Sequence, residues 1–441
     1  MESDHSKVQC PAILIAAPGH NQGRTSVTAA LARYHRNQGR QVRVFKAGPD
    51  FLDPYIHQCA SGHVVENLDL WMVGVTRSQI LLFKAAQQAD LIIIECSTGL
   101  YDTNPVCSEI SSRFGVPMMV VVNGSANTQR SQDFIDDMVT LGSDLPIAGV
   151  LVNQVADDYQ PALLKARLQE GIGYFGHIPY ASSFEISNRH QDLLRETELS
   201  KMDQQLDDAA KVIEQAGITE LPDPVTFTDI PQAQIPPLLE GIRIGVARDQ
   251  AFAFIYNANL TLLESMGAEV VFFSPLHDQC LPNVDSLWFP GGYPELYLEE
   301  LAANITMKAS IREFHAEGKS ILAECGGMMY MLGSLVNRTG IESRMVGLLP
   351  GRGQMLEHLA GLGQHSVTID DQIIRGHVFH HSRMESGMEP VTVSDRRHGR
   401  RPGETLYQHA GLIASYVHFY FPSNPLLTAK FFGSPIFSNS D

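Results

Sequence analysis

Five short runs in the first 155 residues are apolar rather than alternating, and this pattern restricts the fold more than any other feature. The runs are 12–17, 41–46, 91–95, 117–123 and 148–153. A parallel strand that is buried on both faces has this pattern, whereas a strand with one face in water alternates apolar and polar residues. Helical patterns lie between some of the runs, over 25–38 and 160–170. The sequence therefore predicts an α/β domain built on a doubly wound parallel sheet.

A second unit is expected after a proline-rich segment. Residues 217–240 contain five prolines and little periodicity, which is typical of a linker. The elements expected after it are strands over 242–247, 269–274, 286–290 and 321–324 and a helix over 256–266. A chain of 441 residues is long enough for two or three domains. We therefore expect domains at 1–216 and 241–441, joined by this linker.

Charge and cysteine content exclude several classes of protein. A net charge of -17 argues against a protein that binds the phosphate backbone of nucleic acid. The six cysteines show no paired spacing and no C-x-x-C, which fits a reducing compartment and gives no zinc or iron–sulfur signature. No signal peptide and no apolar stretch long enough to span a bilayer is evident. The expectation is a cytoplasmic protein without nucleic-acid or membrane partners.

Cys325 lies between a short apolar strand and a helical run, in ILAECGGMMYML. A nucleophile on a sharp strand-to-helix turn is exposed at the edge of a sheet, near the positive end of the helix, which lowers the pKa of a thiol. The stretch alone is also consistent with a buried cysteine before a glycine turn.

Two further stretches favour the reactive cysteine. The strand over 286–290 ends at Gly291-Gly292, whose backbone N–H groups are suited to bind an oxyanion. His418 lies in the apolar run ASYVHFYF, where an imidazole needs a polar partner. Cysteine, histidine and a glycine turn are the parts of thiol-based acyl transfer.

The stretches E-C-G-G, P-G-G-Y-P-E and Y-V-H resemble the class I glutamine amidotransferase domain of the cobyrinic acid a,c-diamide synthase family. The resemblance implies that Cys325 attacks the carboxamide of L-glutamine, that His418 acts as base and acid, and that ammonia is released. It also implies an oxyanion site at backbone N–H groups near Gly292 and Gly326. Many amidotransferases carry glutamate two residues after the histidine; here that position is Tyr420, and members of this subfamily generally lack the acid too.

The segment IIRGHVFHHSR (373–383) also resembles this subfamily. Its charged side chains could line the route of ammonia or the interface with the first domain; they are Arg375, His377, His380, His381 and Arg383. The alternative is a polar strand with stacked histidines. We expect none of these residues to be catalytic.

The stretch AAPGHNQGRTSV (16–27) has the position of a phosphate-binding loop, directly after the first apolar run. In such a loop, backbone N–H groups and a helix N-terminus bind phosphate. The family's ATP-binding loop aligns with Asn21, Gln22, Gly23, Arg24, Thr25 and Ser26. Asparagine tolerates the positive φ that the turn requires at position 21. Arg24 replaces the family's lysine and keeps its charge, but its planar fork is bulkier than an ammonium group.

Three further stretches resemble the synthetase domain of the same family, which is dethiobiotin synthetase-like. FKAGPDFLDPYIH (45–57) implies that Asp50 and Asp53 act near Mg²⁺ and the substrate, and LIIIECSTGLYDT (91–103) contributes Glu95 and Asp102. Asn153 is implied near the base of the nucleotide. The implied sets are Thr25, Asp50 and Glu95 for Mg²⁺, and Asp50, Asp53 and Asp102 for substrate or intermediate. Asp69, in NLDLWM, either binds substrate or caps a turn.

The function that the resemblance implies is ATP- and glutamine-dependent amidation of the a and c acetates of cobyrinate or hydrogenobyrinate. The carboxylate would be activated as an acyl phosphate, and ammonia released at Cys325 would displace the phosphate. Two alternatives stay open: a paralogue that amidates another tetrapyrrole such as nickel-sirohydrochlorin, and a nucleotide-binding or regulatory protein with impaired ligase activity. Arg24, Asn123 and the altered segment 187–194 motivate the second alternative. The expected partners are L-glutamine and a tetrapyrrole polycarboxylate, and a homodimer is left open.

Overall fold

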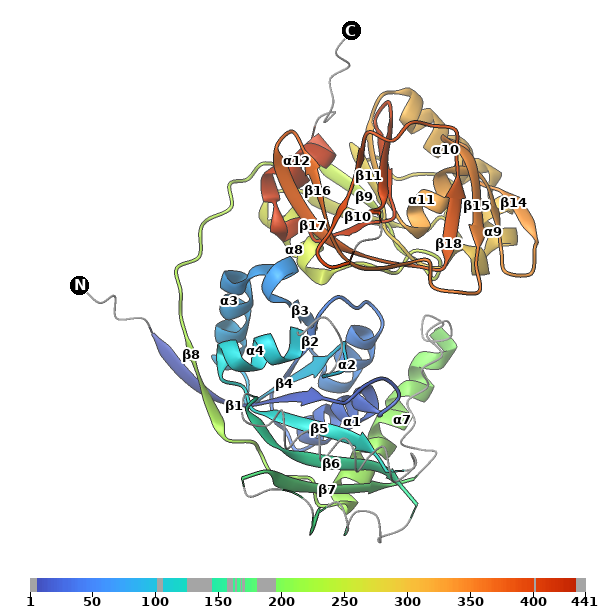
Figure 1. The fold of residues 1–441 in the computed structure, drawn as a ribbon. Coiled ribbons are helices and arrows are strands. Elements are labelled where there is room, and N and C mark those ends of the chain that lie inside the picture. Colours follow the sequence, from blue (N-terminus) through green and yellow to red (C-terminus); the bar gives the residue numbers. More distant parts are fainter. Residues whose placement is uncertain are drawn as a thin grey trace. The chain divides into compact units, whose positions relative to one another are not determined.

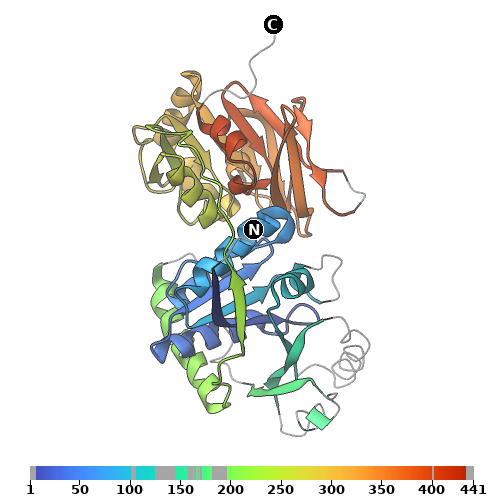
Figure 2. The ribbon, with the colours of Figure 1, turned by 90° about the vertical axis from the view of Figure 1, so that its left-hand side faces the viewer.

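The chain forms two compact units, residues 1–232 and 233–441 (Figures 1 and 2). The computed structural model describes residues 6–100, 106–124, 145–156, 162, 165–166, 168, 171–180, 196–399 and 402–433. The division between the units falls inside the predicted linker, 217–240. No helix in the described ranges is long and apolar enough to cross a membrane.

The first unit is built on a parallel sheet with the strand order β3-β2-β4-β1-β5-β6-β7. The strands are β1 (Lys7–Ala16), β2 (Val42–Ala47), β3 (Glu66–Leu68), β4 (Leu91–Cys96), β5 (Met118–Asn123), β6 (Ile147–Val155) and β7 (Gly173–Pro179). All five predicted strands are confirmed. The sequence did not predict β3, which has three residues, or β7, which contains two glycines and lies half-buried at the sheet edge.

Helices cover both faces of this sheet (Figure 1). They are α1 (Arg24–Asn37), α2 (Asp53–Ser61) and α7 (Glu196–Gln215) on one face, and α3 (Val75–Ala86) and α4 (Val106–Phe114) on the other. Successive residues of β1 point to opposite faces, so that Ile13 packs with the first set and Leu14 with the second. Burial on both faces explains the apolar runs. The helix predicted over 160–170 lies mostly outside the described residues.

The predicted linker contains a strand, β8 (Pro224–Thr228), which pairs antiparallel with the first half of β1 (Figure 2). The register runs from Lys7 opposite Thr228 to Pro11 opposite Pro224. The parallel neighbour β4 pairs with β1 only over Ala12–Ile15, so the first half of β1 offers its backbone groups to β8. Proline is tolerated in such a strand because it lies at an edge.

The second unit contains a seven-stranded sheet in the order β10-β9-β11-β12-β22-β21-β19 and two four-stranded sheets, β14-β13-β15-β18 and β20-β16-β17-β23. The seven strands are β9 (Arg243–Ala247), β10 (Glu269–Phe273), β11 (Ser286–Phe289), β12 (Ser320–Glu324), β19 (Thr392–Val393), β21 (Thr405–His409) and β22 (Leu412–Ser415). The others are β13 (Leu332–Val336), β14 (Glu342–Arg344), β15 (Leu349–Met355), β16 (Gly361–Ile369), β17 (Gln372–His380), β18 (Ser382–Glu385), β20 (Asp395–Arg396) and β23 (His418–Phe419). The helices are α8 (Asn257–Ser265), α9 (Leu298–Ala303), α10 (Ile305–Ala316), α11 (Gly326–Met331) and α12 (Pro425–Gly433). The strands and the helix predicted for this unit are confirmed.

The topology of this unit brings the residues predicted for thiol chemistry to one edge of the seven-stranded sheet. Strand β12 pairs in parallel with β11 on one side and with β22 on the other. The carboxyl ends of parallel strands meet at the same edge of a sheet. Gly291, Cys325 and His418, which follow these three strands, therefore gather there.

Cys96 and Cys107 form a disulfide between the end of β4 and α4. The sequence analysis found no paired spacing among the cysteines and did not predict this pair. Packing of α4 against the sheet brings the two Cα atoms within 5.7 Å.

Candidate active sites

Cys325 lies on the sharp strand-to-helix turn that the sequence predicts. It is the residue between β12 and α11, and its backbone has φ 45° and ψ -105°. A positive φ is costly for a non-glycine residue and is often found at functional sites. The backbone N–H of Cys325 donates to the carbonyl of Ser415 on β22, at 2.7 Å, which helps to hold the turn.

Glycines allow the turn to pack against the end of β11. A Cβ on Gly326 would lie 2.9 Å from the backbone nitrogen of Gly292, and one on Gly327 would lie 2.1 Å from the carbonyl oxygen of Phe289. Gly291 approaches His418 just as closely, because a Cβ there would lie 2.2 Å from Cε1 of the imidazole. The four residues predicted for glutamine hydrolysis are thus brought together; they are Cys325, His418, Gly292 and Gly326.

Burial controls the protonation of the cysteine and the histidine. Burial raises the pKa of the Cys325 thiol, and the Glu295 carboxylate adds to this effect. Burial also lowers the pKa of His418 well below its ordinary value, with a further contribution from His377. The sequence led us to expect a lowered thiol pKa; burial instead outweighs the hydrogen bond from the Gly326 N–H, and the pKa is raised. Both shifts favour a neutral thiol and a neutral imidazole in the resting site.

Glu324 is a site residue that the sequence analysis missed. Its side chain is buried; one oxygen accepts from Trp288 Nε1 at 2.9 Å and the other from the backbone N–H of Phe419 at 2.9 Å. Burial raises the pKa of this carboxyl to about 8. Glu324 therefore ties the nucleophile's strand to β11 and to the strand that carries His418. A charged residue at the end of an apolar strand, directly before the candidate nucleophile, was an available signal.

The 373–383 segment lies beside this site, as β17 and the residues that follow. The carbonyl of Phe379 is 3.9 Å from Cys325 Sγ. His380 stacks on Tyr416 with ring centroids 3.7 Å apart, and its Nε2 lies 3.3 Å from a Glu404 oxygen. Two histidines of the segment are stacked, as the alternative expected, but on rings outside it: His380 on Tyr416 and His377 on His418. Arg383, by contrast, pairs with an exposed glutamate, Glu385.

In the first unit, the loop between β1 and α1 has the backbone that the sequence predicts. Asn21 adopts φ 59° and Gly23 adopts φ 85°. A Cβ on Gly23 would lie 2.1 Å from Nδ2 of Asn153, so only glycine fits there. The prediction that asparagine replaces glycine in a left-handed conformation at position 21 is confirmed.

The ends of the next two strands hold this loop. Asn153 Nδ2, at β6, donates to the carbonyl of Gln22 at 3.1 Å. The backbone N–H of Asn123, at the end of β5, donates to Oε1 of Gln22 at 2.7 Å. Asn153 and Asn123 therefore both support the loop from the sheet edge.

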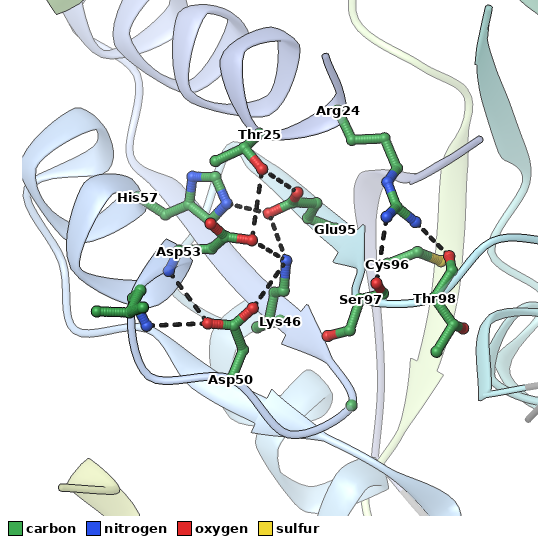
Figure 3. A network of polar contacts seen from close by, with 12 residues as sticks. Arg24, Thr25, Lys46, Asp50, Asp53, His57, Glu95, Cys96, Ser97 and Thr98 are labelled. Atoms are coloured by element: carbon green, nitrogen blue, oxygen red, sulfur yellow. Dashed lines mark hydrogen bonds and ion pairs between the residues drawn. The ribbon is translucent and has the colours of Figure 1, made fainter. Parts of the chain in front are cut away.

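Arg24, the first residue of α1, is directed to the loop after β4 (Figure 3). Its guanidinium donates to the carbonyl of Ser97 at 3.1 Å and to that of Thr98. Figure 3 shows it apart from the charged cluster beside it. Two divergent donors on a planar fork can hold two carbonyls at once, which an ammonium group does less well. Ser26, also predicted to bind ATP, is half-buried in the same first turn of α1.

A charged cluster around Lys46 lies next to the start of α1 (Figure 3). Lys46 Nζ is 2.5 Å from Asp53 Oδ2, 3.0 Å from Glu95 Oε2 and 3.6 Å from Asp50 Oδ2. The hydroxyl of Thr25 donates to Glu95 at 2.8 Å, and His57 contacts the other oxygen of the same carboxylate. Three of the residues predicted for metal or substrate therefore surround one buried cation.

Burial and the charges within the cluster shift the pKa values of its side chains. Burial opposes the charge of Glu95, but Lys46 and His57 outweigh it and hold the pKa of the carboxyl below its ordinary range. Burial likewise opposes the charge of Lys46, and the carboxylates of Asp53 and Glu95 raise its pKa. Asp50 differs, because burial and Asp53 raise its pKa to about 6. The sequence analysis missed Lys46, although a lysine in an otherwise buried strand was an available signal.

The side-chain oxygens of this cluster are of the type that binds a hard divalent cation. Thr25 offers a hydroxyl and its neighbours offer carboxylates, which are the oxygen ligands that Mg²⁺ prefers. One ammonium group faces three carboxylates, so the site keeps an excess of negative charge. Within the described ranges, no group of three or more Asp, Glu, His or Cys side chains is already arranged to hold a metal ion.

Two other residues singled out in the sequence are Asp69 and Asp102. Asp69 accepts from the backbone N–H groups of Trp71 at 2.8 Å and Met72 at 2.5 Å, at the start of the π-helix η1 (Leu70–Gly74). It therefore caps a turn, the second of the two roles left open. Asp102 and the segment 187–194 lie outside the described residues.

Comparison with known proteins identifies the domain that contains each site. Residues 13–194 match the CobQ/CobB/MinD/ParA nucleotide binding domain, and residues 243–426 match the CobB/CobQ-like glutamine amidotransferase domain. The chain is 47% identical over 424 residues to hydrogenobyrinate a,c-diamide synthase of Pseudomonas aeruginosa, covering 96% of this chain and 98% of the relative. It is 48% identical over 420 residues to the enzyme of that name from Stutzerimonas stutzeri, covering 95% and 98%. It is 39% identical over 427 residues to cobyrinate a,c-diamide synthase of Herminiimonas arsenicoxydans, covering 96% and 97%. The chain belongs to the cobyrinate and hydrogenobyrinate a,c-diamide synthase family.

Proposed function

We propose that the protein converts hydrogenobyrinate to its a,c-diamide in cobalamin biosynthesis, with glutamine as nitrogen donor and ATP as activator. One observation carries the proposal: a single chain holds a nucleophile turn with its histidine and, in its other unit, a phosphate loop beside a carboxylate cluster. Two relatives named for hydrogenobyrinate share 47% and 48% identity with the chain, against 39% for a relative named for cobyrinate. This difference favours the metal-free substrate.

Glutamine hydrolysis follows from the neutral Cys325–His418 pair. His418 takes the thiol proton as Sγ attacks the carboxamide carbon, because a free thiolate is disfavoured in this buried site. Backbone N–H groups at Gly292 and Gly326 would stabilise the oxyanion. The proton then passes from His418 to the departing nitrogen, which leaves as ammonia, and water cleaves the thioester to give glutamate.

Amide synthesis needs an activated carboxylate. The γ-phosphoryl group of ATP would pass to an acetate side chain, and ammonia would then displace phosphate from the acyl phosphate. Loop residues 21–26 would bind the phosphates through backbone N–H groups, with Arg24 and Lys46 as nearby cations. Thr25, Asp50 and Glu95 would hold Mg²⁺, which supplies charge neutralisation at the phosphates when bound. Asp53 and Asp102 would order the substrate or the attacking ammonia.

The deciding experiment offers the purified protein glutamine and Mg·ATP with one tetrapyrrole at a time. Hydrogenobyrinate, cobyrinate and nickel-sirohydrochlorin are compared by mass spectrometry of the product and by the consumption of ATP. We expect hydrogenobyrinate to give a diamide with the highest kcat/KM. Preference for nickel-sirohydrochlorin would refute the substrate assignment, and absence of Mg·ATP binding by calorimetry would favour the regulatory alternative. A homodimer and a cytoplasmic location stay predictions, tested by light scattering and by cell fractionation.

A further inference from the structure

The imidazole of His418 faces a second histidine, and the sequence position at which many amidotransferases carry an acid holds a tyrosine. The position two residues after His418 is Tyr420, which is fully buried. His377 of β17 lies directly opposite His418 of β23 in the antiparallel register. Their rings are stacked, with centroids 5.1 Å apart and planes inclined by 23°.

The two strands can approach this closely because Gly376 has no side chain. A Cβ on Gly376 would lie 2.1 Å from the carbonyl oxygen of His418. The strand that carries His418 is also held from α8, where Asn259 donates to the carbonyl of Phe419 at 2.8 Å. Both histidines are buried, with 4% and 1% of their surfaces exposed. The stack is therefore built into the sheet rather than formed by mobile surface side chains.

Tyr256, just before α8, holds the outer histidine of the stack. Its hydroxyl lies 2.7 Å from Nδ1 of His377, in a buried contact. Burial, with a contribution from His365, lowers the pKa of His377 to about 3. Burial therefore favours the neutral form of His377, and the Tyr256 hydroxyl holds its ring.

We propose that His377, held by Tyr256, is a positioning residue for glutamine hydrolysis, and that its ring stacks on His418 and fixes the orientation of that imidazole during turnover. The inference rests on the proposed roles of Cys325 and His418. The stacked ring restricts rotation of the His418 imidazole, so that this ring is already oriented when it takes the thiol proton. The hydrogen bond between the Tyr256 hydroxyl and Nδ1 fixes the orientation of the His377 ring. Stacking thus supplies the orientation of the imidazole, which is one of the roles of the carboxylate in a catalytic triad.

The test uses the full chain with three substitutions. His377→Leu removes the flat ring, His377→Phe keeps a flat neutral ring, and Tyr256→Phe removes only the hydroxyl. The matched control is His315→Leu, because His315 stacks on another histidine, His409, outside this site at 5.4 Å. The readouts are kcat and KM for glutamine, and synthesis with added ammonia, which bypasses the thiol site.

We expect His377→Leu to lower kcat for glutamine by about 10²-fold, the contribution of a well-positioned acid–base group, with little change in KM. His377→Phe should recover most of this loss, and Tyr256→Phe should fall between the wild type and His377→Leu. Ammonia-dependent synthesis and the control should be unchanged. The proposal is overturned if kcat for glutamine of His377→Leu stays within about threefold of the wild-type value. It is also overturned if His377→Leu and His377→Phe are both folded and have equally lowered kcat.

Two further measurements distinguish failure of this proposal from misfolding of a variant and from failure of the thiol assignment. If His377→Leu does not fold, the comparison of Tyr256→Phe with the wild type decides, and an unchanged kcat there refutes the proposal. Cys325→Ala is measured in parallel. Glutamine use that persists in Cys325→Ala would refute the thiol assignment itself, whatever the behaviour of the His377 variants.

Discussion

Replacement of Lys46 by methionine tests the charged cluster of the first unit most directly. Lys46 is 1% exposed and lies within 2.5 to 3.6 Å of oxygens from three carboxylates. Methionine has a similar length and fills the same apolar strand position. The substitution Lys46→Met therefore removes the cation while leaving the buried carboxylates of Asp50, Asp53 and Glu95 in place.

The expected cost follows from what remains buried. Removal of one partner from a buried ion pair destabilises a protein by about 3–5 kcal/mol, because the other charge is left uncompensated. A domain has about 5–15 kcal/mol of stability in total, so the first unit should still fold. Each kcal/mol lowers the Tm of a domain of this size by about 2–4 °C, which predicts a fall on the order of 10 °C.

The dependence on pH distinguishes lost charge compensation from lost packing. Without the cation, burial and mutual repulsion raise the carboxyl pKa values above those of the unfolded chain. A raised carboxyl pKa penalises folding at high pH, and the penalty disappears as pH falls through the folded-state pKa. In the wild type, the stability linked to the lowered pKa of Glu95 is lost only below the ordinary carboxyl range. The deficit of Lys46→Met should therefore shrink between about pH 8 and about pH 5.

Calorimetry and urea titration of the full chain measure both effects. The control is Lys211→Met, because Lys211 is exposed and pairs with Asp208 at the surface of α7. We expect no measurable change in that variant. A deficit for Lys46→Met below about 1 kcal/mol, or one that does not change with pH, would refute the view that Lys46 compensates the buried carboxylates.

Three further substitutions test the two sites. Cys325→Ala should abolish glutamine use and leave synthesis with added ammonia intact, measured by product mass; loss of both would argue against separate sites. Gly291→Ala places a Cβ 2.2 Å from His418 Cε1 and should lower the glutamine-dependent kcat by about 10²-fold, with the ammonia-dependent rate as its control. Arg24→Lys loses one of two carbonyl contacts, to Ser97 or Thr98, and should leave the ATP-dependent rate similar or lower. A large gain would mean that arginine impairs the site.

Local sequence signals were sufficient to predict the layers of the fold and the strand-to-helix turn at Cys325. A parallel strand buried on both faces must be apolar along its length, so the five runs of the first unit were readable without any partner. The turn at Cys325 was readable for a similar reason, because a strand, a nucleophile and two glycines are adjacent in the chain. The conformation of Asn21 could also be predicted locally, because its positive φ depends on its own side chain and its immediate neighbours.

Only the tertiary structure decided which distant residues meet. Lys46 contacts Glu95 because β2 and β4 pair in parallel with these two residues opposite each other, and His377 stacks on His418 because β17 and β23 pair antiparallel in that register. A shift of one residue in either register would turn the side chains to the other face of the sheet, so no local pattern specifies such a contact. Pairing of β8 with β1 has the same origin. Strand register, set by the packing of whole sheets, built the charged cluster and the histidine stack from residues that the sequence leaves far apart.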